Sequence, residues 1–307
     1  MRVAAIDLGT NTTRLLVGDV VDGRVNALVR RSTITRLGEG VDERRRLLPF
    51  PIARVRNCLA DYRRELESLG AERVLLVATS AVRDAENGEA FLGEIEWSYG
   101  FTTRLLSGED EADLTRRGVG DIDASTIVVD IGGGSTELVS SDGRVSTNLG
   151  SVRLTERFLA SDPPTAGELE TLANAIRAVL AEHELSAAHG IGVAGTVTSL
   201  AALDLGLFEY DPDRVHGHRL SPGGVEAQLD RLAALPLAER REVPGLEPER
   251  APVIVAGAAI LLEVMRHLGL GEIEVSERDL LDGAALEAAE LPEPVEGDAP
   301  PGAYTCC

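Results

Sequence analysis

The chain has 307 residues, of which 44% are hydrophobic and 26% are charged, a composition typical of a globular protein with room for two lobes. Its net charge is −21, and all 30 basic residues are arginine because lysine is absent. The missing lysine excludes a Walker-type phosphate loop and Schiff-base chemistry, and the acidity argues against nucleic-acid binding through a basic surface. An anionic ligand would need local arginines, main-chain N–H groups and a divalent cation.

The sequence also predicts the cellular location of the protein. No apolar run reaches the roughly 18 residues that cross a bilayer, and the first strand begins almost at the N-terminus. We therefore expect a cytoplasmic protein that contacts no membrane. Its cysteines, Cys58, Cys306 and Cys307, provide neither a disulfide framework nor a metal knuckle.

The chain begins with a predicted meander of three strands over 3–7, 14–20 and 24–30. The turn Gly9-Thr10-Asn11-Thr12 joins the first two strands. Glycine lets a backbone approach an anion, and the hydroxyl groups add hydrogen-bond donors. The second turn contains Asp22-Gly23, which is a strong signal for a tight hairpin.

Strands and helices alternate after the meander. Apolar residues at helical spacing predict a helix over 52–69, and the apolar run 73–79 predicts a buried strand. A helix over 87–99 and a short strand over 103–106 follow. Ser107 is the expected cap of the next helix, whose first turn is acidic. These elements form a first lobe over residues 1–124.

Residues 125–145 repeat the pattern of residues 3–25. In both copies an apolar run ends in Asp and is followed by a turn of small residues, a second apolar run and an Asp-Gly-Arg-Val turn. The equivalent pairs are Asp7 with Asp130, Gly9 with Gly132, Thr12 with Ser135, Thr13 with Thr136, and Arg14 with Glu137. The repeat suggests two phosphate-gripping hairpins that face each other across a cleft.

The second lobe is expected over residues 125–290, with 291–307 as a disordered, proline-rich tail. Its predicted helices cover 151–160, 165–185, 222–235, 250–268 and 279–290. Strands are predicted over 191–194 and 272–276, and 214–219 as an extended segment. A repeated meander with alternating strands and helices implies an α/β fold of two lobes, each with a mixed sheet flanked by helices.

The motifs DLGTNTTRLLV at 7–17 and DIGGGSTELV at 130–139 resemble the two phosphate motifs of the actin, hexokinase and Hsp70 superfamily. Further motifs narrow the resemblance to the exopolyphosphatase and guanosine pentaphosphate phosphatase family, in its short two-lobe form. They are TSAVRDAENG at 79–88, SGEDEADLTRRGV at 107–119, GVAGTVTSLAAL at 192–203 and VSERDLLDGAAL at 275–286. The resemblance implies two actin-like (ribonuclease H-like) lobes, an interdomain catalytic cleft and a homodimer.

The resemblance also assigns catalytic roles. Glu111 matches the family's general base, which would activate water, while Glu109 and Asp110 are expected bystanders. Without the family match, Glu109, Asp110 and Glu111 indicate only the acidic first turn of a helix. Arg83 matches a phosphate contact, although the residues alone also allow a pair with Asp84 or Glu86.

Metal and phosphate contacts complete the predicted site. Asp7, Asp130 and Glu137 would hold Mg²⁺ (or Mn²⁺) through carboxylate oxygens, although an aspartate at such a turn can also cap its own amides. The predicted catalytic residues are Glu111, Asp130, Glu137 and Arg83. The predicted phosphate-binding residues are Gly9, Thr10, Asn11, Thr12, Arg14, Gly132, Gly133, Gly134, Ser135, Gly195 and Thr196.

The leading functional hypothesis is exopolyphosphatase activity, the Mg-dependent hydrolysis of terminal phosphate from inorganic polyphosphate. Within the family, the alternative is removal of the 5′ phosphate from guanosine pentaphosphate. A non-catalytic, nucleotide-binding actin-like protein and a sugar or acid kinase are alternatives of other classes. The kinase would need an aspartate base and a sugar-binding insertion. His216 and His218 are interpreted as structural or peripheral substrate contacts.

Overall fold

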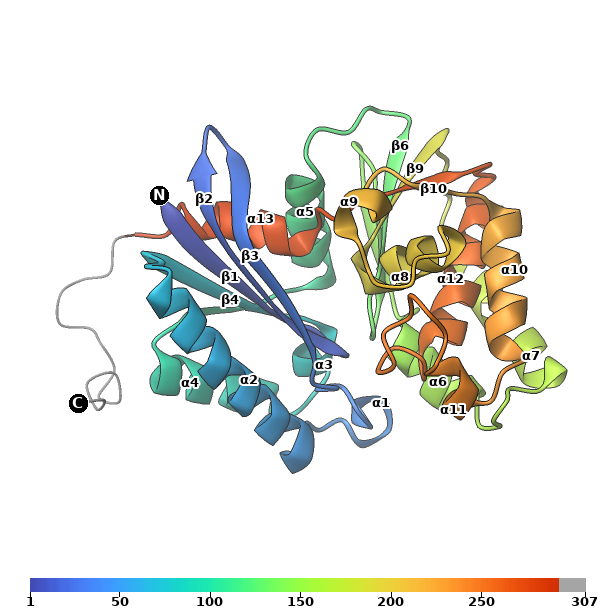
Figure 1. The fold of residues 1–307 in the computed structure, drawn as a ribbon, viewed down its shortest axis with the longest axis horizontal. Helices are drawn as coiled ribbons and strands as arrows, with labels where there is room; N and C mark the ends of the chain where they lie inside the picture. The colour runs from blue at the N-terminus through green and yellow to red at the C-terminus, as the bar shows by residue number, and fades with distance from the viewer. Residues whose placement is uncertain (293–307) are drawn as a thin grey trace. The chain divides into compact units, whose positions relative to one another are not determined.

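The computed structural model of the protein describes residues 1–292. The described residues fold into two compact units, the first comprising Met1–Gly120 and residues 280–292, the second Asp121–Asp279 (Figure 1). Each unit holds one mixed sheet flanked by helices, as predicted. No helix within residues 1–292 has the length and apolar character needed to cross a membrane.

The first unit is built on a five-stranded sheet in the order β3-β2-β1-β4-β5. Its strands are β1 (Arg2–Leu8), β2 (Thr12–Val21), β3 (Arg24–Ile34), β4 (Arg73–Ala78) and β5 (Thr102–Leu105). β1 runs antiparallel to β2 and parallel to β4. Asp22 and Gly23 have φ of 50° and 72°, the left-handed pair that a tight hairpin turn requires, so this predicted turn is confirmed.

Helices cover both faces of this sheet. On one face, alternate residues of β1 such as Ile6 pack against α2 (Pro49–Ser68) and α4 (Gly88–Tyr99). On the other face, Val3 and Ala5 pack against α5 (Gly108–Val119) and α13 (Leu280–Ala288). Because strand side chains alternate between faces, a strand buried on both sides reads as the continuous apolar run seen at the N-terminus. Two short helices, α1 (Val41–Arg44) and α3 (Ser80–Arg83), complete the unit.

The position of α13 corrects one prediction. Residues 279–290 were expected in the second lobe, yet Leu281, Ala284 and Ala288 are buried in the first unit's core with β1. Figure 1 shows this last helix alongside β1. Helical periodicity identifies an apolar face but not the core that buries it, so this placement could not be predicted from the sequence. Of the predicted tail, all but Leu291 and Pro292 lies outside the described residues.

The second unit has a six-stranded sheet in the order β10-β11-β9-β6-β7-β8. Its strands are β6 (Thr126–Ile131), β7 (Thr136–Val139), β8 (Arg144–Thr147), β9 (His189–Val193), β10 (Arg219–Leu220) and β11 (Ile273–Val275). Its helices are α6 (Ser151–Phe158), α7 (Ala166–Leu180), α8 (Ala194–Asp204), α9 (Pro212–Val215), α10 (Pro222–Ala233), α11 (Leu237–Arg240) and α12 (Ile254–Leu268). α12 is buried over nearly its whole length, which places it in the core of this unit.

The two sheets share one topology. In both, an antiparallel meander is followed by a parallel strand beside its first strand, β4 beside β1 and β9 beside β6. The duplication predicted from the hairpins therefore extends to the order of the meander and the parallel strands beside it, while the second sheet adds the antiparallel edge strand β10.

The segment 214–219 differs from its prediction. Only Arg219–Leu220 is a strand, and Pro212–Val215 is a short helix because the Asp211 side chain accepts hydrogen bonds from Asp213 N and Arg214 N. His216 and His218 therefore lie outside any strand. His218 Nε2 lies 2.8 Å from Asp204 Oδ2, and His216 Nδ1 accepts a hydrogen bond from Glu277 N.

Candidate active site

The two glycine-rich turns have the same geometry. Gly9 N donates to Thr12 O at 3.0 Å, and Gly132 N donates to Ser135 O at 3.0 Å. A Cβ on Gly9 would lie 2.9 Å from Thr12 O, which explains the glycine at this position. The predicted equivalence of the two turns is therefore confirmed at the level of individual hydrogen bonds.

In the first hairpin, Asp7 lies directly opposite Arg14 across β1 and β2. Arg14 Nε and Nη2 both contact Asp7 Oδ2, at 2.9 and 2.8 Å, and the Asp7 side chain is 7% exposed. The predicted metal ligand and the predicted phosphate contact thus form one ion pair. The Arg14 side chain is 21% exposed, so it is less enclosed than the carboxylate that it holds.

In the second hairpin, the same cross-strand position joins two carboxylates. Asp130 lies opposite Glu137, and the residues are 7% and 3% exposed. Ser146 Oγ donates to Glu137 Oε1 at 2.8 Å. Like charges directly opposite each other are destabilising, whereas a divalent cation held by both would offset that repulsion. Oxygen-only donors suit Mg²⁺ or Mn²⁺.

The metal site predicted from Asp7, Asp130 and Glu137 is not a closed protein cage. Within residues 1–292, no cluster of three or more histidine, cysteine or carboxylate side chains is arranged to hold a metal. Mg²⁺ commonly binds through one or two carboxylates and takes its remaining ligands from water and phosphate. The pair Asp130 and Glu137 fits that mode of binding.

Helix α5 carries Glu111 and begins with a capping box. Ser107 N and Oγ donate to Asp110 Oδ2 at 2.9 and 2.5 Å, while Asp110 N donates to Ser107 Oγ at 3.1 Å. This confirms Ser107 as the helix cap. Asp110, expected to be a bystander, fixes the turn from which Glu111 projects.

Glu111 and Arg83 form an ion pair. The Glu111 side chain is 7% exposed, and Arg83 Nη1 also donates to Leu106 O at 2.7 Å. The guanidinium therefore fixes the direction of the carboxylate. Arg83 is the last residue of α3, and helix α5 starts 25 residues after it. The sequence therefore indicated only the nearby partners Asp84 and Glu86.

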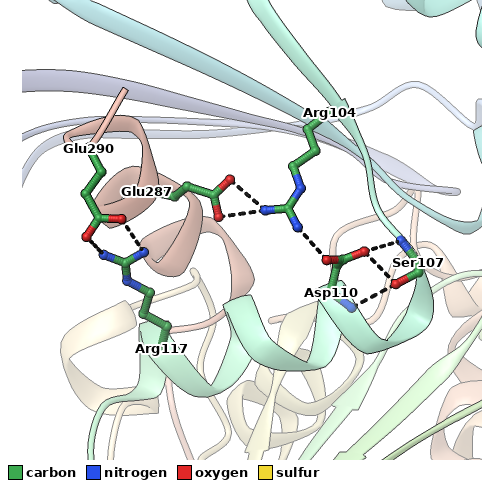
Figure 2. Close-up of polar contacts among 6 residues, drawn as sticks. All are labelled: Arg104, Ser107, Asp110, Arg117, Glu287 and Glu290. Atoms are coloured by element: carbon green, nitrogen blue, oxygen red, sulfur yellow. Dashed lines mark hydrogen bonds and ion pairs between the residues drawn. The ribbon is translucent and has the colours of Figure 1, made fainter. Parts of the chain in front are cut away.

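A second arginine links α5 to α13 (Figure 2). Arg104 Nη1 donates to Glu287 Oε1 and Oε2 at 2.6 and 2.8 Å, and its Nη2 contacts the Asp110 carboxylate. At the other end of α5, Arg117 contacts Glu290 through two hydrogen bonds. Sequence reasoning missed the pairs of Arg104 with Glu287 and of Arg117 with Glu290, since the partners in each are more than 170 residues apart.

We expect the contribution of Asp110 to stability to depend on pH. Its pKa lies below the ordinary value of 3.8, first because Ser107 Oγ donates to the carboxylate and further because Arg104 is close. A lowered folded-state pKa stabilises the protein above the unfolded value, and this contribution is lost as pH falls through the folded value. Urea unfolding at about pH 6 and about pH 3 should show the difference between wild type and Asp110→Asn shrinking at the lower pH. A difference that stays constant would contradict this assignment.

The third predicted turn lies at the start of α8. Ala194 has φ of 67°, and Gly195 lies against the Arg250 guanidinium, where a Cβ would be 2.0 Å from Arg250 Nη1. The Thr196 methyl faces Gly257 of α12, so this side chain packs into the unit's core. A ligand at this turn would meet main-chain N–H groups and Arg250, a residue that sequence reasoning missed.

Two α/β units with repeated sheet topology and matching glycine-rich hairpins define a protein of the actin-like fold class. Residues 16–290 match the Ppx/GppA phosphatase family, and the chain belongs to that family. It is therefore a phosphoanhydride hydrolase.

Relatives agree over nearly the whole chain. Exopolyphosphatase 2 of Mycobacterium tuberculosis is 39% identical, over 94% of this chain and 98% of that protein. The crystal structure of the Aquifex aeolicus Ppx/GppA family member is similar with a TM-score of 0.80 and 32% identity, over 94% of this chain and 98% of that one. An exopolyphosphatase structure from Cytophaga hutchinsonii has a TM-score of 0.83 and 26% identity, over 92% and 96%.

Proposed function

We propose that the chain is an exopolyphosphatase that removes terminal phosphate from inorganic polyphosphate in a Mg²⁺-dependent reaction. The observation that carries the proposal is the 39% identity to exopolyphosphatase 2 over almost the full length of both chains. The buried Glu111, fixed by Arg83 at the start of a capped helix, supports the chemistry.

In the proposed reaction, Glu111 accepts a proton from water while the water oxygen forms a new bond to the terminal phosphorus. The bond between that phosphorus and the bridging oxygen breaks, and the shortened chain leaves. Arg83 would orient Glu111 and contact the phosphoryl oxygens. Main-chain N–H groups of the two glycine-rich turns would hold the phosphates. Asp130 and Glu137 would hold Mg²⁺, which supplies neutralisation of phosphate charge when it is bound.

The substrate is tested by direct comparison. Purified protein with Mg²⁺ is incubated separately with polyphosphate and with guanosine pentaphosphate, and the initial rates of phosphate release are compared. Faster release from polyphosphate supports the proposal, and faster release from guanosine pentaphosphate would replace it with the family alternative. ATP binding with no phosphate release from either substrate would favour the non-catalytic actin-like protein. Homodimerisation and a cytoplasmic location stay predictions.

We expect metal removal to stop the reaction. Chelation with EDTA should abolish phosphate release, and added Mg²⁺ or Mn²⁺ should restore it. Glu137→Gln should raise the Mg²⁺ concentration needed for half-maximal rate by about tenfold or more, since it removes one of two charged ligands. Glu274→Gln, on the exposed side of β11, is the matched control. A metal requirement equal in both variants would remove Glu137 from the site.

A further inference from the structure

In the second glycine-rich turn, the carbonyl groups of the three glycines accept hydrogen bonds from the start of α6. Ser151 N donates to Gly132 O at 3.0 Å, and Val152 N and Arg153 N donate to Gly133 O at 2.8 and 3.2 Å. The third carbonyl, Gly134 O, accepts from the Arg153 side chain at Nε, 2.8 Å away. The start of α6 thus lies against the carbonyl groups of Gly132, Gly133 and Gly134.

This arrangement decides where the N–H groups of the turn point. In a planar trans peptide, the N–H of each residue is directed opposite to the carbonyl of the residue before it. Because the carbonyls of Gly132, Gly133 and Gly134 face α6, the N–H groups of Gly133, Gly134 and Ser135 are directed away from α6. Three N–H groups on one side, with the carbonyl oxygens turned away, form an anion-binding surface.

Close packing makes the arrangement possible. A Cβ on Gly150 would lie 2.2 Å from Gly134 C and 2.3 Å from Gly133 O, so only glycine lets α6 approach the turn this closely. Arg153 is 8% exposed, which makes its hydrogen bond to Gly134 O a buried one.

In the first unit, the carbonyl groups of the glycine-rich turn also accept hydrogen bonds from a later segment, although the residues differ. Gly38 N donates to Thr10 O at 2.8 Å, and Thr35 N and Arg36 N donate to Asn11 O at 3.1 and 2.9 Å. A Cβ on Gly38 would lie 2.2 Å from Thr10 Cγ2. In both units, therefore, the segment that follows the third strand of the meander donates hydrogen bonds to carbonyl groups of the glycine-rich turn.

We propose that Arg153 is a positioning residue for phosphate binding, acting through Gly134 O to orient the N–H groups of the Gly132–Ser135 turn toward the substrate's phosphate. The proposal rests on the proposed function, because it assumes that this turn binds polyphosphate. The contact with Gly134 O is made by the Nε donor, so the proposed role belongs to this donor rather than to the charge of the guanidinium.

Two substitutions separate the donor from the charge. In Arg153→Gln, the amide nitrogen stands the same number of bonds from the backbone as Arg153 Nε, so the donor is kept and the charge is lost. In Arg153→Lys, a methylene group takes the Nε position, so the charge is kept and the donor there is lost. Arg157→Gln, an exposed arginine one turn later in α6, is the control.

The Michaelis constant for polyphosphate and the calorimetric affinity for inorganic tripolyphosphate are measured for each variant, with the melting temperature. We expect Arg153→Lys to weaken both by about tenfold, as for one lost buried hydrogen bond, and Arg153→Gln to stay within about threefold of wild type. A larger loss in Arg153→Gln than in Arg153→Lys, or a lower melting temperature with unchanged affinity, would overturn the proposal. Wild type that binds tripolyphosphate without hydrolysing polyphosphate would refute the proposed function and leave this test intact.

Discussion

Replacing Glu111 by glutamine is expected to lower phosphate release by about 10²- to 10⁴-fold while substrate affinity is retained. Glutamine has nearly the same shape as glutamate and can still accept a hydrogen bond from Arg83, so helix α5 keeps its geometry. The carboxamide cannot accept the proton of water, so the loss falls on the chemical step. The expected signature is therefore a fall in kcat with little change in the affinity for tripolyphosphate.

The control for this experiment is a substitution of Glu109, two residues before Glu111. Glu109 belongs to the same first turn of α5 but is exposed, and Glu109→Gln removes the same charge without touching the proposed base. Its kcat should stay close to that of wild type. If Glu109→Gln lost as much turnover as Glu111→Gln, the acidic first turn would act through its charge alone, and if Glu111→Gln retained full turnover, its carboxylate would play no part in the reaction. Glu111 would then not be the base.

The duplicated hairpins were predictable because their signals are local. The apolar runs, the Asp22-Gly23 turn and the small residues of the glycine-rich turns each specify a conformation within a few residues. Asp142-Gly143 lies instead in a longer connection between Val139 and Arg144, and neither residue has a positive φ. The copies differ at the position opposite the aspartate, where Arg14 stands in one and Glu137 in the other. The same backbone thus places an arginine beside the aspartate in one hairpin and a second carboxylate beside it in the other.

The remaining parts of the site depend on contacts between distant segments. Nothing near Arg83 identifies Glu111 as its partner, and nothing near Arg104 identifies Glu287. The hydrogen bonds to the carbonyl groups of the glycine-rich turns were missed for a related reason. Most of their donors are main-chain N–H groups, which leave no pattern in the sequence. Gly38 and Gly150 were the available signals, because each stands where a side chain would collide with a turn. A glycine outside any predicted turn can therefore mark a close approach of two backbones.

Gly283→Ala is expected to destabilise the first unit by about 3 kcal/mol or more, beyond the usual cost of one added methyl group. A Cβ on Gly283 would lie 1.9 Å from Leu114 O and 2.7 Å from Leu114 C. Both contact atoms belong to the backbone of α5, so no side-chain rotation relieves the collision. The two helices would have to separate. Leu114 lies about one turn beyond Glu111, so the separation should also disturb the ion pair of Glu111 with Arg83.

Gly93→Ala provides the matched control for this test. Gly93 lies inside α4 of the same unit, is exposed, and would place a Cβ with no heavy atom within 4 Å. Alanine in a helix interior is favoured over glycine by about 0.5–1 kcal/mol, so this variant should be slightly more stable than wild type. Urea unfolding of the two variants should therefore shift in opposite directions, and kcat should fall only in Gly283→Ala. Equal shifts would mean that α13 does not pack against α5 as closely as the backbone contact requires. The C-terminal helix would then have no part in holding the helix that carries the base.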